Sequence, residues 1–284
     1  MRDFKALKNC LTQIQYNNYN IPKGIDMDGL INDMLTFIGH ADQELRDKLI
    51  YSTFYIWADN SIISTTQMQH ILTTCLGDKY LFFGIGEKDT DSVFTRAFSS
   101  LAIALAFFVH EKIPFLTMDD VQGIKHSLLH YISQEKDYRG YVDDKGWAHA
   151  TAHIADALGG VADCKIDGKF CFQREALLEI LQAVKHLACI KDCVYTAEED
   201  ERLVSVVNAV CCNNILTNDD LIGWIDSFAA TINQQQDMNI NDYYLQVNHK
   251  HFLRSLYFNF LSCNDEFDTV DTSVICKHLL TLLV

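Results

Sequence analysis

Three residues between positions 149 and 156 have the types and the spacing to do chemistry. His149, His153 and Asp156 recur at i, i+4 and i+7, so a helix over this stretch would present them on one face. Two imidazoles four residues apart on a helix can chelate a transition metal such as zinc. The carboxylate can be a third ligand or can accept a hydrogen bond from His153. The spacing therefore predicts a zinc-type site as one use of this face.

Two other interpretations fit the same residues. Each imidazole can instead hydrogen-bond a carbonyl or a nearby carboxylate, such as Asp137 or Asp143, and so fix the preceding charged loop to the core. In the third interpretation, the stripe and Arg139 form a metal-free pocket for an anionic or polar ligand, in which one histidine transfers a proton. The three interpretations stay open, because no H-E-x-x-H arrangement or nucleophile motif accompanies the histidines.

The helix that would carry this stripe is predicted over 145–159. Asp143 or Asp144 is a suitable N-cap, and a Gly-Gly pair is a suitable stop at the other end. Lys, Glu and Gln cover the wet face of an ordinary helix, but they are absent from 148–162. We therefore expect protein to surround this helix, with its polar stripe facing buried partners or the floor of a cleft.

Several arginines suggest an internal repeat. Arg96 follows Arg46 by 50 residues, and Arg254 follows Arg202 by 52, each near the start of a helical pattern. A period of this length with two helices per unit is typical of a HEAT-like α-solenoid. Two interpretations fit Arg202 and Arg254: they line a concave groove that binds a carboxylate or phosphate through bidentate contacts, or they pair with local Asp and Glu side chains on the surface. Arg96 and Arg139 are the other candidates for that groove.

Apolar residues at helical spacing recur along the whole chain, without sustained strand-like alternation. We therefore predict an all-α fold with one domain over 1–284, in which helical pairs stack into an αα-hairpin superhelix. An irregular helical bundle and an αα-barrel are the alternatives. The predicted helices span 3–16, 26–39, 43–58, 65–76, 91–111, 118–134, 145–159, 173–190, 197–213, 218–234, 242–262 and 269–283. The predicted capping boxes are Ser64-x-x-Gln67 and Thr196-x-x-Glu199, and the predicted single caps are Asp42, Asp91, Thr117 and Thr217.

The composition limits the classes of partner. A formal charge of −15, spread along the chain, argues against binding nucleic acid through a broad basic surface. The longest apolar run, 101–109, is about half as long as a membrane span, and the N-terminus lacks the apolar core of a signal peptide. The ten cysteines include no C-x-x-C pair and fit reduced core residues. We expect a cytoplasmic protein that binds neither nucleic acid nor membrane.

The residues around the stripe carry a recognisable signature. It consists of ExDxRGYV at 135–142, GWAH at 146–149 and AHxxD at 152–156, with EEDERL at 198–203 and FLRSLY at 252–257 as later blocks. This pattern resembles that of a bacterial family catalogued as a domain of unknown function, number 2785. The resemblance covers most of the chain. It implies an all-helical fold and no particular activity.

Two classes of function follow. The first is a binding or scaffold module, whose polar concave site on the GWAHATAH helix holds a small anionic ligand or a peptide. The alternative is a metal-dependent, zinc-type hydrolase, in which His149, His153 and a third ligand activate water while Arg139 stabilises developing negative charge. We favour the binding module, because no evident general base accompanies the two histidines. Whether the protein is an enzyme stays open.

Overall fold

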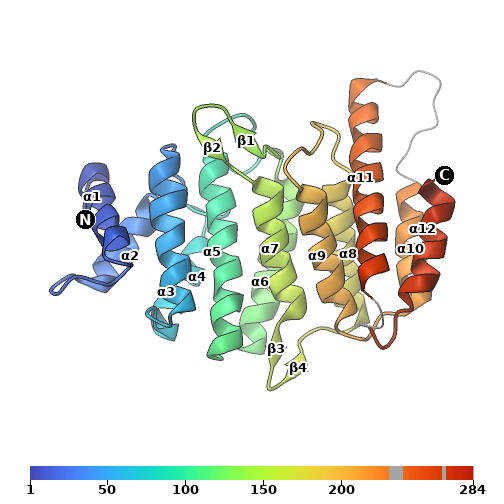
Figure 1. Ribbon diagram of the computed structural model, residues 1–284, viewed down its shortest axis with the longest axis horizontal. Coiled ribbons are helices and arrows are strands. Elements are labelled where there is room, and N and C mark those ends of the chain that lie inside the picture. Colours follow the sequence, from blue (N-terminus) through green and yellow to red (C-terminus); the bar gives the residue numbers. More distant parts are fainter. Residues whose placement is uncertain (230–238, 264–266, 284) are drawn as a thin grey trace. The chain divides into compact units, whose positions relative to one another are not determined.

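The computed structural model describes residues 1–229, 239–263 and 267–283, and this part of the chain is built almost entirely of helices (Figure 1). The strands within it form two short antiparallel hairpins. The predicted all-α fold is therefore confirmed. Most of the predicted ranges agree with the helices to within a few residues, and 118–134 matches at both ends. The end of the range predicted over 218–234 lies outside the described residues.

The elements follow one another along the chain with short connections. They are α1 (Phe4–Tyr16), α2 (Met27–Thr36), η1 (Glu44–Tyr51), α3 (Ser52–Asp59), α4 (Thr65–Cys75), α5 (Ser92–Lys112), α6 (Met118–Gln134), β1 (Tyr141–Val142), β2 (Gly146–Trp147), α7 (Ala150–Asp163), β3 (Lys165–Ile166), β4 (Lys169–Phe170), α8 (Arg174–Ala188), α9 (Glu199–Cys211), α10 (Asn218–Ala229), α11 (Ile240–Ser262) and α12 (Thr272–Leu283). The segment η1 is a π-helix that continues directly into α3, where the sequence predicts one regular helix.

The chain divides into two compact units. Unit 1 consists of Met1–Asp120 and Gln134–Ala157, and unit 2 consists of Val121–Ser133 and Leu158–Val284. The division falls within α7, and α6 belongs almost wholly to unit 2. The single domain over 1–284 stays a prediction.

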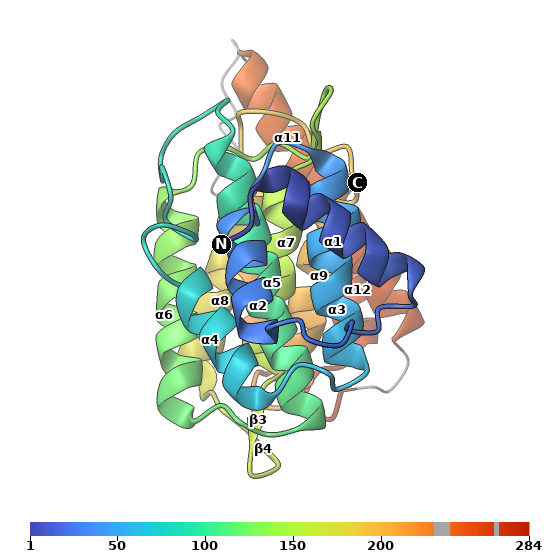
Figure 2. The same cartoon turned by 90° about the vertical axis from the view of Figure 1, so that its left-hand side faces the viewer.

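Unit 1 contains two layers of helices. In the first layer α1 packs on η1, and α3 packs on α5. In the second layer α2 packs on α4, which in turn packs on α5 (Figure 2). The apolar residues Met68, Ile71 and Leu72 of α4 recur at helical spacing and are buried, as an amphipathic helix requires. Helix α5 is thus covered by both α3 and α4.

Unit 2 repeats this arrangement. Helix α9 packs on α8 and on α11, while α11 packs on α12. Helix α10 packs on both α8 and α12, and Figure 1 shows α9, α11 and α12 in front of α8 and α10.

Hydrogen bonds inside each unit join residues roughly one predicted repeat apart. In unit 1, Lys112 donates to Asp59 and Lys145 donates to Asp91, over 53 and 54 residues. In unit 2, the amide of Asn213 donates to the carbonyl of Ala162 over 51 residues. Further bonds in unit 2 span 53 to 55 residues, namely Asp271 to Asn218, Asp268 to Asn214 and Ser255 to Asp200. Corresponding positions in successive helical pairs therefore lie side by side.

Helix α5 is the core helix of unit 1. Among the described residues, α5 is the one helix whose length and apolar composition would allow it to cross a membrane. However, 83% of its most apolar window is buried within the protein. Its apolar character is explained by packing against α3 and α4.

The predicted helix caps have mixed outcomes. The capping box of Ser64 and Gln67 is present, and the side chains of Asp42, Thr117 and Thr217 each accept an N–H in the first turn. The two predictions that are wrong are Asp91, whose side chain caps nothing, and the box at Thr196. In the latter, Glu198 occupies the N-cap with a φ of 62°, and the Glu199 carboxylate accepts the N–H of Ala197 instead.

The core of unit 2 contains a buried histidine, His249. His249 is 7% exposed, and its ring stacks on Phe228 with a centroid distance of 5.3 Å. Within the part of the chain that the structure describes, neither ring nitrogen has a hydrogen-bond partner. Burial, together with the charges of Lys185 and Lys250, lowers the pKa of His249 to about 4. The neutral imidazole is therefore the form that the folded protein holds.

This histidine makes a prediction for the pH dependence of stability. Unfolded histidine titrates near pH 6.5, whereas folded His249 takes up its proton only near pH 4. The free energy of unfolding is thus expected to be full above pH 6.5 and to fall by up to about 3 kcal/mol as the pH drops to 4. His249→Phe should remove this part of the pH dependence in urea unfolding measured at several pH values. His251→Gln, which changes an exposed histidine, should retain it; equal slopes in wild type and His249→Phe would contradict the prediction.

Candidate functional site

The chain before α7 forms a hairpin, not the predicted first turn of a helix. Strand β1 pairs with β2, with Tyr141 opposite Trp147, and α7 begins at Ala150. Asp144 and His149 have φ angles of 63° and 50°, and Gly146 between them has 77°. A right-handed helix excludes such angles. The predicted helix over 145–159 is therefore wrong at its N-terminus.

Helix α7 also continues past its predicted stop. It ends at Asp163, so Gly159 and Gly160 lie inside it. Glycine within a helix costs about 1 kcal/mol relative to alanine, and the packing of a buried helix can outweigh this cost. The neighbours Leu158 and Val161 are completely buried, which supplies that packing.

A buried arginine fixes the hairpin in place. Arg46 lies on η1 and is 0% exposed, and its Nη2 donates to the carbonyls of Lys145 and Trp147 at 2.8 and 2.9 Å. Its Nη1 donates to the carbonyl of His40 at 2.8 Å. The guanidinium also lies over the ring of Phe94 at 4.1 Å, and burial lowers its pKa. One side chain thus joins η1 to the turn and to strand β2 of the hairpin.

The two histidines of the predicted stripe lie next to each other at the start of α7. The carbonyl of His149 accepts the N–H of His153, which places His149 at the N-cap position. Their ring centroids are 5.5 Å apart. The ring of His149 stacks on Trp147 at 4.1 Å, whereas that of His153 meets Phe98 of α5 edge-on at 5.0 Å. Asp156 is half-buried on the same helix, one turn further on.

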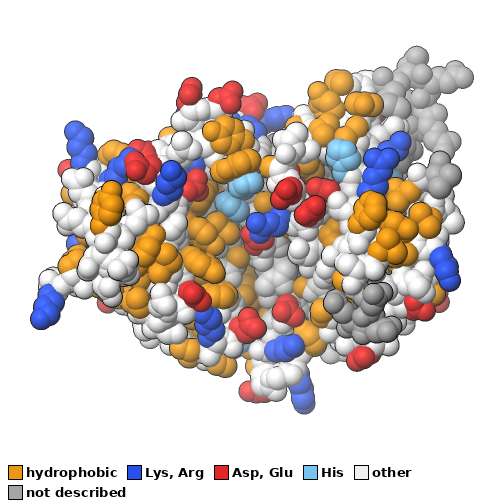
Figure 3. Space-filling view, in the orientation of Figure 1, with side chains coloured by type: hydrophobic (Ala, Val, Ile, Leu, Met, Phe, Trp, Pro, Cys, Tyr) orange, Lys and Arg blue, Asp and Glu red, His pale blue; other side chains and the backbone are white. Residues whose placement is uncertain are grey.

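These rings form a continuous aromatic row, which we define as Tyr141, Trp147, His149, His153 and Phe98. Tyr141 contacts Trp147 edge-on at 4.9 Å and begins the row on the hairpin. Tyr141 and Trp147 are 54% and 40% exposed, while the other end of the row is buried. On the face shown in Figure 3, hydrophobic and histidine side chains lie together at the surface where Figure 1 places the two strands and the start of α7.

Asp137 and Arg139 form a bidentate pair beside the hairpin. Arg139 donates from Nε and Nη2 to the two carboxylate oxygens of Asp137 at 2.7 and 2.6 Å, and from Nη2 to the carbonyl of Thr90. The hydrogen bond to Asp137 raises the pKa of the Arg139 guanidinium. Asp137 is buried and also accepts the N–H of Asp89. The pair therefore ties the loop at 89–90 to the segment before β1.

The predicted arginine groove is not assembled as expected. Arg96 is 0% exposed, and it donates to Glu135, to Ser92 and to the carbonyls of Phe83 and Gly84. It is therefore a core residue, and the prediction that it lines a groove is wrong. The reason is that its partners come from other segments. They are the buried carboxylate of Glu135, which is distant in sequence, and two carbonyls in the loop before α5.

Arg202 and Arg254 are exposed on α9 and α11, neighbouring helices of unit 2. A pocket of about 340 Å³ opens between these helices, and Glu201, Ser255 and Phe258 are among its lining residues. The Ser255 hydroxyl there donates to Asp200. Carboxylates rather than guanidinium groups thus stand closest to this pocket, and anion binding by the two arginines stays a prediction.

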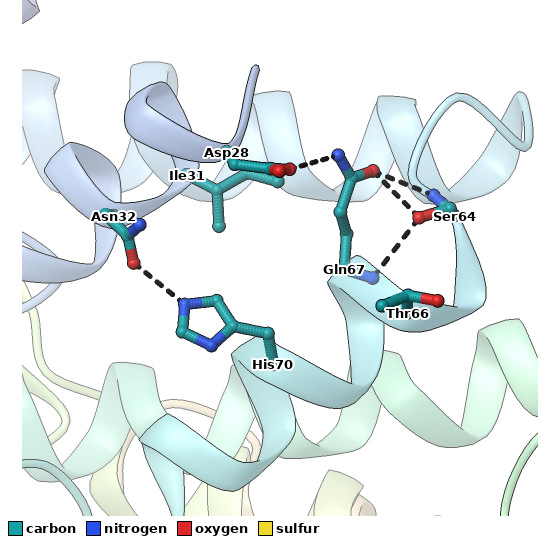
Figure 4. A pocket seen from close by; sticks show the side chains of 7 residues that line it. All are labelled: Asp28, Ile31, Asn32, Ser64, Thr66, Gln67 and His70. Atoms are coloured by element: carbon teal, nitrogen blue, oxygen red, sulfur yellow. Dashed lines mark hydrogen bonds between the residues drawn. The ribbon is translucent and has the colours of Figure 1, made fainter. Parts of the chain in front are cut away.

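A second pocket, of about 360 Å³, lies between α2 and α4 in unit 1 (Figure 4). Its polar side chains bind one another: the amide of Gln67 donates to Asp28, and His70 pairs with Asn32 at 2.8 Å. Gln67 also belongs to the capping box of α4. The pocket is therefore lined by polar side chains that join α2 to α4. Of these contacts, the sequence indicates the capping box alone.

Metal ligation by the stripe stays a prediction. Across the described residues, no group of three or more His, Cys, Asp or Glu side chains is placed to hold a metal ion. His149 and His153 are close enough to contribute two ligands, and Asp156 stands on the same helix. The sequence did not indicate the roles of Tyr141 and Arg46, although the Asp-Asp-Lys-Gly turn before Trp147 is a signal that could have revealed the hairpin.

Comparison with known proteins gives one match. A family model described as "Protein of unknown function (DUF2785)" matches residues 81–258, which include α5, the hairpin, the whole aromatic row and most of α11. No curated protein and no solved structure matches the chain significantly.

Proposed function

The chain belongs to the DUF2785 family, whose function is unknown, and we propose that it is a binding module that holds a peptide on its aromatic row. The carrying observation is that Tyr141 and Trp147 stand exposed on a hairpin that a buried arginine holds rigidly. Exposed aromatic residues on rigid supports are typical anchors of protein interfaces.

We further propose that the helical pairs form a HEAT-like α-solenoid. Hydrogen bonds that span 51 to 55 residues within each unit support a repeat of two helices per period. Proteins of this architecture use extended surfaces made by successive repeats to bind peptides and partner proteins. The aromatic row crosses α7 and α5, which are successive odd-numbered helices, and so has the placement of such a surface.

A peptide fits this surface better than a small anion. The guanidinium of Arg139 is engaged by Asp137 and Thr90, so it offers little to an anionic ligand. Asp143 and Asp144 are exposed on the hairpin beside the row, and the whole chain carries a charge of −15. We therefore propose a peptide with basic residues, which aromatic faces and carboxylates attract together. The same charge supports our proposal of a cytoplasmic protein that binds neither nucleic acid nor membrane.

Trp147→Ala is expected to weaken the binding of basic peptides at least 10-fold, because a central aromatic anchor typically contributes 2 kcal/mol or more. The melting temperature should fall by no more than about 2 °C, because the side chain is exposed. The probe is an array of synthetic 12-residue peptides of varied charge. The peptides that bind are then labelled with fluorescein and titrated by fluorescence anisotropy, a signal that does not depend on Trp147 and so measures the wild type and the variant alike.

The matched control for this prediction is Phe258→Ala, which removes another exposed aromatic side chain, from α11. It should leave peptide affinity unchanged. Retention of affinity in Trp147→Ala, or failure of the wild type to bind any basic peptide in the array, would contradict the proposed function.

The alternative function is a zinc-type hydrolase, and the adjacent rings of His149 and His153 are the observation in its favour. Such a site needs a third protein ligand and an open position for water. Elemental analysis of untagged protein, purified after growth with added zinc, distinguishes the two functions. Stoichiometric zinc that is lost in both His149→Ala and His153→Ala would favour the hydrolase over the binding module.

A further inference from the structure

The hairpin between α7 and α8 places two cysteines directly opposite each other. Strand β3 pairs with β4 in the register Lys165 opposite Phe170 and Ile166 opposite Lys169. Asp167 and Gly168 form the tight two-residue turn, with φ angles of 51° and 74°. The next pair outward in this register is Cys164 and Cys171, and the N–H of Cys171 donates to the carbonyl of Cys164 at 3.2 Å.

The register brings the two thiols together. Residues that share a backbone hydrogen bond across antiparallel strands have Cα atoms about 5.5 Å apart, which lies within the range that a disulfide spans. Burial and the neighbouring Cys171 raise the pKa of the Cys164 thiol to about 12, so the two thiols are close enough to interact. Both cysteines are free thiols in this structure and are 6% and 9% exposed.

We infer that Cys164 and Cys171 form a reversible disulfide that closes the β3–β4 hairpin and clamps the end of α7 to the start of α8. The register of the hairpin and the contact between the thiols carry this inference. A low-molecular-weight disulfide such as oxidised glutathione is the oxidant. The inference does not depend on the proposed peptide binding, because the hairpin belongs to unit 2 and the aromatic row to unit 1.

The exchange proceeds in two steps that balance. Cys171, the more exposed of the two cysteines, loses its thiol proton and attacks one sulfur of oxidised glutathione; a mixed disulfide forms and one glutathione thiolate leaves. The Cys164 thiolate then attacks the Cys171 sulfur and expels the second glutathione. The two protein thiols lose two electrons and two protons, and one oxidised glutathione becomes two reduced glutathione molecules.

Tryptic mapping tests this inference on the full chain. Cleavage at Lys145, Lys165, Lys169 and Arg174 puts each cysteine alone in its own peptide, 146–165 and 170–174. After incubation with oxidised glutathione, we expect these two peptides to run as one linked species about 2 Da lighter than their sum. Excess reduced glutathione should separate them again. The oxidised protein should melt about 5 °C higher, because the closed loop restricts the unfolded chain.

Cys164→Ser and Cys171→Ser should each abolish the linked species and the shift in melting temperature. Cys212→Ser, which changes an exposed cysteine of the same unit, should alter neither. The inference would be overturned if Cys171 stops at the mixed glutathione disulfide in the wild type, or if these cysteines stay reduced while others become linked.

Discussion

Arg96→Met is expected to lower the free energy of unfolding by about 3–5 kcal/mol, the typical cost of removing one partner of a buried ion pair. Arg96 donates from Nε and Nη2 to the two carboxylate oxygens of Glu135 at 2.6 and 2.9 Å, and both side chains are buried. In the variant, the Glu135 carboxylate keeps the N–H groups of Lys136 and Asp137 but loses its counter-charge. Equilibrium unfolding in urea, followed by circular dichroism, measures the change.

The double variant Arg96→Met/Glu135→Met separates the pair from its surroundings. Because the second substitution removes the stranded charge, the double variant is expected to be no less stable than Arg96→Met alone. Lys112→Met is the matched control: its ion pair with Asp59 is largely exposed, so it should cost less than about 1 kcal/mol. An Arg96→Met variant as stable as Lys112→Met would contradict the prediction.

The helices could be predicted from the sequence because the signals that define them are local. Apolar spacing and caps lie within the segment itself, and so the range 118–134 and the cap at Ser64 agree with the structure. The start of α7 was missed for an equally local reason. Three residues with positive φ precede it, and only one of them is a glycine; the short Asp-Asp-Lys-Gly turn is the sequence signal for this hairpin.

The roles of the arginines could not be predicted, because their partners are distant in sequence. Arg46 and Arg96 occupy equivalent places in the predicted repeat with Arg202 and Arg254, yet the first two are buried and the last two are exposed. Glu135 lies 39 residues from Arg96, and the Trp147 carbonyl lies 101 residues from Arg46. Spacing along the chain predicts a repeat, but it does not predict which of these arginines has a buried acceptor.

Arg46→Met is expected to loosen the β1–β2 hairpin as well as to destabilise unit 1. Methionine can keep the packing on Phe94, but it leaves the carbonyls of His40, Lys145 and Trp147 without their donor. Each unsatisfied buried carbonyl costs about 1–3 kcal/mol, so a total loss of about 3–5 kcal/mol is expected. Hydrogen exchange should accelerate most at the amides of 141–149, and peptide affinity should fall at least 10-fold while the protein stays folded.

Arg46→Lys distinguishes positioning from charge. An ammonium keeps the positive charge but lacks the rigid fork that reaches the carbonyl of His40 from one nitrogen and those of the hairpin from the other. If the arginine acts by positioning, the lysine variant should show the same rapid exchange at 141–149, with a smaller loss of stability. Arg202→Met, an exposed arginine of unit 2, should affect neither measurement. Slow hydrogen exchange at the hairpin in both Arg46 variants would show that the pairing of β1 with β2 is enough to keep Trp147 in place. The strands, and not Arg46, would then supply the rigid support that the proposed peptide binding requires.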